Sequence, residues 1–142
     1  MTHRTIALLL SLLATQVAAE QFKAFDDIEV HYVVVNTLFL QSEVAARYGV
    51  IRSKDRAIVN LSVLDRTGVA LLATVSGESI NLLSQRTPLE FAVTREGDAI
   101  YYIAPIRYTD QDVLRFALSV SMPDRAPMNF EFQQQMYVEP DR

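Results

Sequence analysis

The chain has 142 residues, 50% of them hydrophobic, and a formal net charge of −4 at pH 7. This acidic balance argues against a nucleic-acid partner, which would need a basic patch or stripe, and against adsorption to anionic membranes. Because the chain contains no cysteine, disulfides, thiol nucleophiles, cysteine metal sites and a lipid-modified N-terminal cysteine are all excluded.

The N-terminus has the three parts of a cleavable secretory signal. Arg4 and the chain start provide positive charge, residues 6–14 are almost entirely apolar, and small residues precede Glu20. A retained membrane anchor would need about 20 apolar residues, and this run is about half as long. We therefore expect a signal peptide over residues 1–19, cleavage after Ala19 and export to the periplasm. Residues 20–142 then form a single soluble domain with no membrane span in the mature form.

The first elements of the mature chain are a strand and a short helix. Residues 30–35 are apolar on both faces and rich in β-branched side chains, which predicts a strand covered on both sides. At residues 42–48 the pattern changes: Ser42 is suited to the N-cap of a helix, an acidic residue and alanines follow, and Gly49 suits a left-handed C-cap.

The remainder of the chain is dominated by strand patterns. Residues 56–64 and 69–75 predict two strands joined by a hairpin turn, in which Gly68 permits the positive φ that such a turn requires. Further strands are expected where apolar and polar residues alternate or where both faces are apolar, at 89–93, 100–106, 114–122 and 130–138. Additional turns are expected at 76–77, 96–98, 109–110 and 123–124.

These elements predict an all-β fold, because seven or more short strands are separated by a turn signal about every ten residues. We expect a two-sheet antiparallel sandwich, immunoglobulin-like, with about seven strands and one short helix near 42–48. A closed barrel is the alternative, since the number of strands does not distinguish the two.

Catalytic and metal-binding patterns are scarce. His31 is the only histidine after the expected cleavage point, which is too few for a zinc site, and it lies in an apolar strand with no nucleophile elbow elsewhere in the chain. Asp110-Gln111-Asp112 and Asp26-Asp27 are typical of turns rather than of a calcium loop. Ser53 and Lys54 are neighbours, so they point to opposite faces of a strand and do not form a dyad. We expect no enzyme activity, no catalytic residues, no metal and no cofactor.

One cluster is a candidate site. Four basic residues and a tyrosine lie within ten positions in an otherwise acidic chain and could bind an anion or an acidic partner surface; they are Arg47, Tyr48, Arg52, Lys54 and Arg56. The alternative is that these cations stabilise the negative end of the helix and solvate a loop.

Several segments resemble one protein family over nearly the whole mature chain. They are residues 20–23, 36–40, 43–50, 52–54, 57–60, 99–104 and 132–138, with the most specific motif from Tyr48 to Lys54. The family comprises small exported proteins of Gram-negative bacteria and is catalogued as a domain of unknown function (family number 4426). The resemblance implies a periplasmic β-rich domain and implies no catalytic residues.

Three functions remain open at this point. The first is a non-enzymatic binding module that uses the basic loop or a free sheet edge to hold an unknown periplasmic protein or an anionic ligand. The second is a small-molecule or lipid carrier with an apolar pocket between the sheets, suggested by seven Phe and six Tyr. The third is a hydrolase that uses paired carboxylates.

Overall fold

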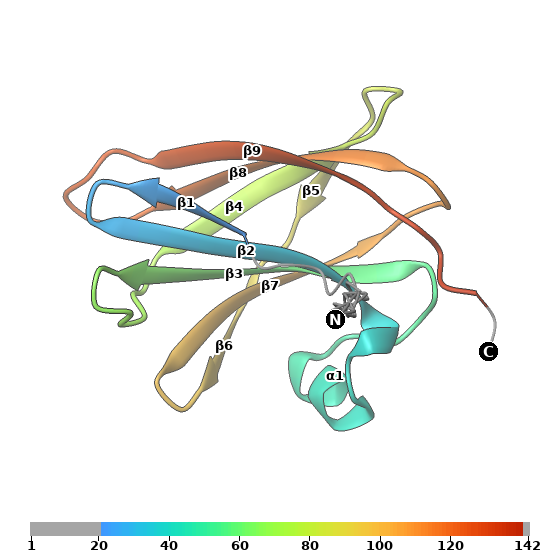
Figure 1. Ribbon diagram of the computed structural model, residues 1–142, viewed down its shortest axis with the longest axis horizontal. Helices are drawn as coiled ribbons and strands as arrows, with labels where there is room; N and C mark the ends of the chain where they lie inside the picture. The colour runs from blue at the N-terminus through green and yellow to red at the C-terminus, as the bar shows by residue number, and fades with distance from the viewer. Residues whose placement is uncertain (1–20, 141–142) are drawn as a thin grey trace, which may run out of the picture.

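The structure, a computed structural model, describes residues 21–140 and consists of two stacked antiparallel sheets (Figure 1). The expected signal peptide and its cleavage site lie outside these described residues. The elements are β1 (Gln21–Phe25), β2 (Ile28–Asn36), η1 (Thr37–Phe39), α1 (Ser42–Tyr48), β3 (Arg56–Asp65), β4 (Thr74–Ile80), β5 (Arg86–Leu89), β6 (Ala92–Glu96), β7 (Ala99–Arg107), β8 (Val113–Ser121) and β9 (Met128–Gln135). Among the described residues, neither of the two helices has the length and apolar character that crossing a membrane requires.

The strand order is that of an immunoglobulin-like sandwich. One sheet has the order β1-β2-β3-β7-β6 and the other the order β5-β4-β8-β9. If β2 to β9 are taken as strands A, B, C, C′, D, E, F and G, these orders become A-B-E-D facing C′-C-F-G, with β1 as an additional edge strand. The predicted sandwich is therefore confirmed, with nine strands rather than about seven, and the barrel alternative is wrong because both sheets have free edges.

The core lies between the sheets and follows from the alternation of the strands. In β2 and β8 every second side chain is buried, and their partly exposed neighbours point outward. Aromatic side chains link the sheets along one side, where the ring centroids of Tyr32 in β2 and Phe132 in β9 are 4.4 Å apart. Phe132 also stacks on Phe116 within the four-stranded sheet, at 4.9 Å. This packing fills the interior with close side-chain contacts.

The short helix covers part of the outer face of the five-stranded sheet. Ile58 and Ile103 alternate with core residues and so point outward, yet both are buried, as is Ala45 of α1. The helix ends as predicted at Gly49, which has a φ of 65° and whose N–H donates to the Ala46 carbonyl. Ser42 does not cap the helix but is its first residue, because Gln41 occupies the cap position.

The predicted turn at Ser76-Gly77 is wrong, because both residues lie within β4. A Cβ at Gly77 would lie 2.5 Å from Cδ2 of Leu118 and 2.6 Å from the Ala117 carbonyl oxygen. The glycine therefore permits a close approach of β8 rather than a reversal of the chain.

Two predicted strands are also interrupted where the chain passes from one sheet to the other. The second arm of the hairpin predicted over 69–75 is only begun: Ala70 bridges to Leu64, and the Leu71 N–H donates to the Val63 carbonyl at 2.8 Å. The chain then leaves β3 and enters the opposite sheet as β4. Residues 89–93 are split between the end of β5 and the start of β6, which belong to different sheets. The strand expected over 130–138 ends at Gln135. In the first two cases the apolar pattern continues through a change of hydrogen-bonding partner.

Candidate functional site

The structure places two of the five predicted site residues on a single carboxylate. Arg47 Nη1 lies 3.4 Å from Oε1 of Glu96, and the Tyr48 hydroxyl donates to the same oxygen across 3.2 Å. Burial and the neighbouring Glu96 raise the pKa of the Tyr48 hydroxyl above its usual value. These contacts attach the C-terminal end of α1 to the end of β6, and they offset the charge of Arg47.

The other three predicted residues do not converge on a common point. Arg52 donates from Nη1 to Ser42 Oγ at 3.3 Å and from Nη2 to the Leu38 carbonyl at 3.2 Å. Lys54 contributes its backbone carbonyl to a polar network, and Arg56 lies opposite Arg107 in the pairing of β3 with β7. Much of the predicted patch is therefore engaged with the protein itself, and anion binding by these residues stays a prediction.

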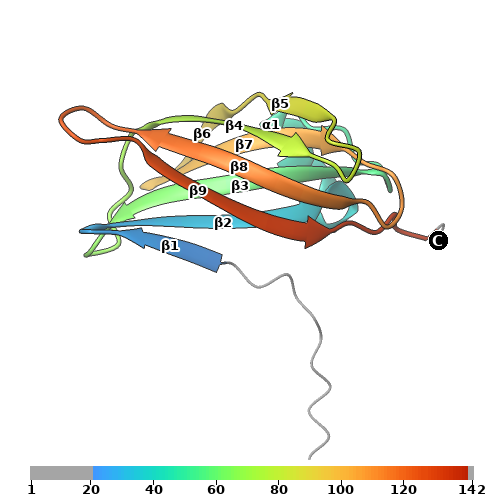
Figure 2. The ribbon, with the colours of Figure 1, turned by 90° about the horizontal axis from the view of Figure 1, so that it is seen from above.

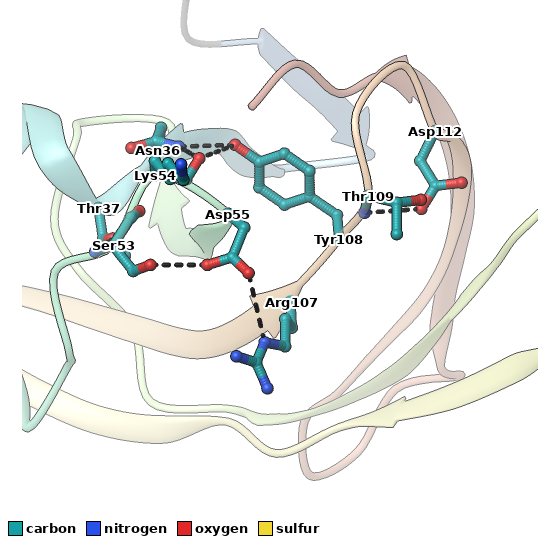
Figure 3. A network of polar contacts seen from close by, with 9 residues as sticks. All are labelled: Asn36, Thr37, Ser53, Lys54, Asp55, Arg107, Tyr108, Thr109 and Asp112. Atoms are coloured by element: carbon teal, nitrogen blue, oxygen red, sulfur yellow. Dashed lines mark hydrogen bonds and ion pairs between the residues drawn. The ribbon is translucent and has the colours of Figure 1, made fainter. Parts of the chain in front are cut away.

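The sequence did not predict the buried polar network that holds the loop between α1 and β3 (Figure 3). The side-chain amide of Asn36 donates to the Tyr108 hydroxyl at 2.6 Å and to the Lys54 carbonyl at 2.9 Å. The Tyr108 oxygen lies 2.7 Å from the Tyr137 carbonyl, to which it donates its proton. Burial raises the pKa of Tyr108. The network therefore joins β2, the loop before β3, the end of β7 and the C-terminal segment.

Hydrogen bonds of Ser53 and Asp55 also hold the loop between α1 and β3. Thr37 Oγ1 donates to the Ser53 carbonyl at 3.0 Å and accepts from the Ser53 N–H at 2.8 Å. The Ser53 hydroxyl donates to Asp55 Oδ1 at 2.6 Å, and Arg107 Nε lies 3.5 Å from Oδ2 (Figure 3). The Ser53 hydroxyl, supported by the Arg107 charge, holds the pKa of Asp55 below its usual range. The loop that carries the basic residues is thus an ordered part of the fold.

Asp110, Asp112 and His31 have structural partners. Asp112 Oδ2 accepts from the Thr109 N–H at 3.1 Å, which confirms the prediction of turn chemistry at this residue. Asp110 Oδ1 instead accepts from the distant Val138 N–H at 2.9 Å, so it attaches the C-terminal segment. His31 Nε2 lies 3.0 Å from Glu29 Oε2, and its ring stacks on Phe22. Over residues 21–140, no group of three or more His, Cys, Asp or Glu side chains is arranged to hold a metal ion.

Two clefts lie on the outer faces of the sandwich. One of about 570 Å³ crosses the outer face of the four-stranded sheet around Gly77 and Ala117, and another of about 570 Å³ lies beside Tyr48, Asn60 and Tyr101 on the other sheet. Neither of these two clefts is the pocket between the sheets that the carrier alternative needs, so the carrier stays a prediction.

One edge strand, β9, lacks most of the usual protections against pairing with another chain, and its only charged residue is Glu131. The edge strands are β1 and β6 of one sheet and β5 and β9 of the other. β1 and β6 have five residues each, and β5 has four with Pro88 among them, whereas β9 has eight residues and contains neither proline nor lysine. Short strands, proline and lysine are the common ways of blocking an edge, so β9 is the most open of the four.

The space beside β9 continues this open edge toward the other sheet. β1 pairs with β2 only as far as Tyr32, so that residues 33–36 have no neighbouring strand on that side within the described chain. A cleft of about 180 Å³ lies between the two edges and is lined by Val33, Val34, Phe132, Gln133 and Gln134, among others. Figure 2 shows β9 and β2 along the same side of the sandwich.

Comparison with solved structures identifies similar folds. A protein of the DUF4426 family from Pseudomonas aeruginosa PAO1 is 31% identical, with a TM-score of 0.78 over 85% of this chain and 97% of its own. FetP of uropathogenic E. coli strain F11, expressed recombinantly in the periplasm, is 11% identical, with a TM-score of 0.62 over 87% of this chain and 97% of its own.

A copper-bound variant of FetP is 12% identical to this chain, with a TM-score of 0.61 over 85% of this chain and 96% of its own. At this identity the likeness to FetP concerns the fold alone. No protein of curated function matches the sequence. The model of the domain of unknown function DUF4426 matches residues 22–139. With this match over most of its length, the chain belongs to the DUF4426 family.

Proposed function

We propose that this protein is a periplasmic, non-enzymatic interaction module that binds an extended segment of a partner protein along β9. The observation that carries the proposal is the eight-residue edge of β9, which is hydrogen-bonded to β8 on one side and, within residues 21–140, has no strand on the other. An extended peptide can add to such an edge through backbone hydrogen bonds, while alternate side chains enter adjacent pockets.

The neighbouring cleft suggests how side chains of the added segment would be accommodated. It is bordered by apolar Val33, Val34 and Phe132 and by the amides of Gln133 and Gln134. A partner with alternating apolar and uncharged polar residues matches this lining, because glutamine side chains can both donate and accept hydrogen bonds.

The periplasmic part of the proposal is supported by the N-terminal charge, apolar run and small residues. The fold shared with FetP, which was produced in the periplasm, is consistent with it. Cell fractionation with an intact mass measurement tests it: the expected result is a periplasmic form that starts at Glu20, and an uncut cytoplasmic form would contradict it.

The interaction is tested with a photo-crosslinking amino acid at Gln134 in β9 and, for comparison, at Thr87 in β5. In living cells the β9 position is expected to give an adduct with one partner segment, identified by mass spectrometry, and the β5 position is expected not to give that adduct. A synthetic peptide of that segment should then slow amide hydrogen exchange in β9.

A matched pair of substitutions completes the test. Gln133→Lys together with Gln135→Lys places charge on the outward side of the edge, and should weaken peptide binding at least tenfold, whereas Thr87→Lys in β5 should leave it unchanged. Equal adducts from both edges, or exchange protection outside β9, would remove the edge from consideration.

A further inference from the structure

The loop between β4 and β5 carries the two most exposed large hydrophobic side chains of the described chain. Leu82 is 78% exposed and Leu83 is 80% exposed. In Figure 1 this loop projects from the upper side of the molecule, beyond the strands. Two adjacent leucines at a projecting tip cannot contribute to the core, so their apolar surface faces outward.

The backbone beneath these leucines is held by a dense set of hydrogen bonds. Asn81 Oδ1 accepts from the N–H groups of both Leu83 and Gln85 at 3.0 Å, and the Asn81 N–H donates to the Gln85 carbonyl at 3.1 Å. The Ser84 N–H donates to the Asn81 carbonyl at 3.0 Å, with a φ of 60° at Ser84. Because the turn is already ordered, burying its tip in a partner costs little backbone entropy.

The chemistry around the tip favours one kind of partner. Residues 81–85 carry no charge, and the next residue, Arg86, is ion-paired with Glu78 of β4. An anionic lipid surface attracts basic segments, and neither this rim nor the net charge of −4 supplies that attraction. A convex apolar tip with a neutral polar rim is complementary to a concave, uncharged apolar pocket, the usual setting of an energetic hot spot.

We infer that Leu82 and Leu83 form an anchor that inserts into an apolar pocket on a protein partner. This inference does not depend on peptide binding at β9, because the loop adjoins β5, at the opposite edge of the same sheet. The experiments at the loop tip and at β9 therefore test the two proposals independently.

The experiment places a photo-crosslinking phenylalanine analogue at Leu83 in the full-length protein in its native cells. The expected result is a discrete adduct with one protein, in which the crosslinked residues line an apolar pocket. Leu82→Asn should reduce the adduct at least tenfold, and Leu82→Met, which remains apolar, should preserve it. The same analogue at Leu72, exposed in the connection at the opposite end of the strands, is the control and should not give this adduct.

A second measurement separates a protein pocket from a bilayer. Since the chain has no cysteine, Leu83→Cys can be labelled uniquely with an environment-sensitive dye and mixed with vesicles of phosphatidylethanolamine and phosphatidylglycerol. The dye emission should not change. A blue shift, an adduct with a second copy of the chain, an adduct unaffected by Leu82→Asn, or no adduct would each overturn the inference. The melting temperature of Leu82→Asn should equal that of the wild type, because the side chain is exposed.

Discussion

The side-chain amide of Asn36 donates a hydrogen bond to the Tyr108 hydroxyl across 2.6 Å, which joins the last residue of β2 to the residue that follows β7. The Tyr108 oxygen in turn lies 2.7 Å from the Tyr137 carbonyl, beyond the end of β9. One buried tyrosine therefore connects three segments that are distant in the sequence, and it fixes the C-terminal segment that continues from the proposed binding edge.

Replacing Tyr108 with phenylalanine should destabilise the fold. The change preserves the ring but leaves the Asn36 amide and the Tyr137 carbonyl short of a buried partner, which costs about 1–3 kcal/mol. Urea denaturation measures the loss, and Tyr137→Phe is the matched control because the Tyr137 side chain is largely exposed. Equal denaturation midpoints for the two variants would show that the buried hydroxyl contributes nothing.

Stability should fall with acidification, in part through Asp65. The Thr67 hydroxyl and the Val69 N–H, which both bond its carboxylate, hold the pKa of Asp65 below its usual value of 3.8. A lowered folded-state pKa gives a contribution that is present above the usual value and is lost as the pH falls through the folded-state value. The denaturation midpoint of Asp65→Asn should therefore change less than that of the wild type between about pH 5 and pH 2.

The control for this titration is Asp98→Asn, a change of an exposed aspartate in the turn between β6 and β7. Its pH profile should follow the wild type more closely than that of Asp65→Asn. If Asp65→Asn keeps the full wild-type slope, the hydrogen bonds in the turn do not couple protonation to folding.

The sequence predicts the strand content well because alternation is a local signal. In β8, apolar and small or polar residues alternate from Leu114 onward, and the pairing with β4 and β9 follows that pattern. The passage between sheets near Glu90 leaves no comparable signal, because Leu89 and Val93 keep the same alternation while their hydrogen-bonding partners change.

The candidate site could be predicted only in part for the same reason, because its contacts involve residues that are distant in the sequence. Arg47 and Tyr48 are close to the other basic residues in sequence, which suggested a common anion site. Their partner Glu96 lies 48 positions beyond Tyr48, and the strand pairing that brings it near is not local. Asn36 could have been noticed as a cap after an apolar strand, since its Oδ1 accepts from the Leu38 N–H at 2.8 Å. The contact of Asn36 with Tyr108 could not be predicted from the sequence.

Gly77 illustrates an ambiguity that a stability measurement resolves. A Cβ at this position would overlap Leu118 Cδ2 and the Ala117 carbonyl, so Gly77→Ala should force β4 and β8 apart and destabilise the protein by about 1–3 kcal/mol. Thermal or urea denaturation measures this, with the exposed Ser76→Ala in the same strand as control. A stability gain in Gly77→Ala would mean that the two strands can separate without loss.

The final prediction concerns Arg56, the first residue of β3. Arg56 lies directly opposite Arg107 in the β3–β7 pairing, and like charges in that relation are destabilising. Arg56→Gln should therefore raise the free energy of unfolding at low ionic strength, and the gain should disappear in about 1 M salt, where the screening length is about 3 Å. Arg95→Gln is the control, because Arg95 lies opposite the uncharged Ile100. A loss of stability in Arg56→Gln at low ionic strength would contradict the repulsion. The melting temperature with and without phosphate tests the same pair as an anion site. If phosphate raises the melting temperature of the wild type but not that of Arg56→Gln, the two guanidinium groups bind the anion together.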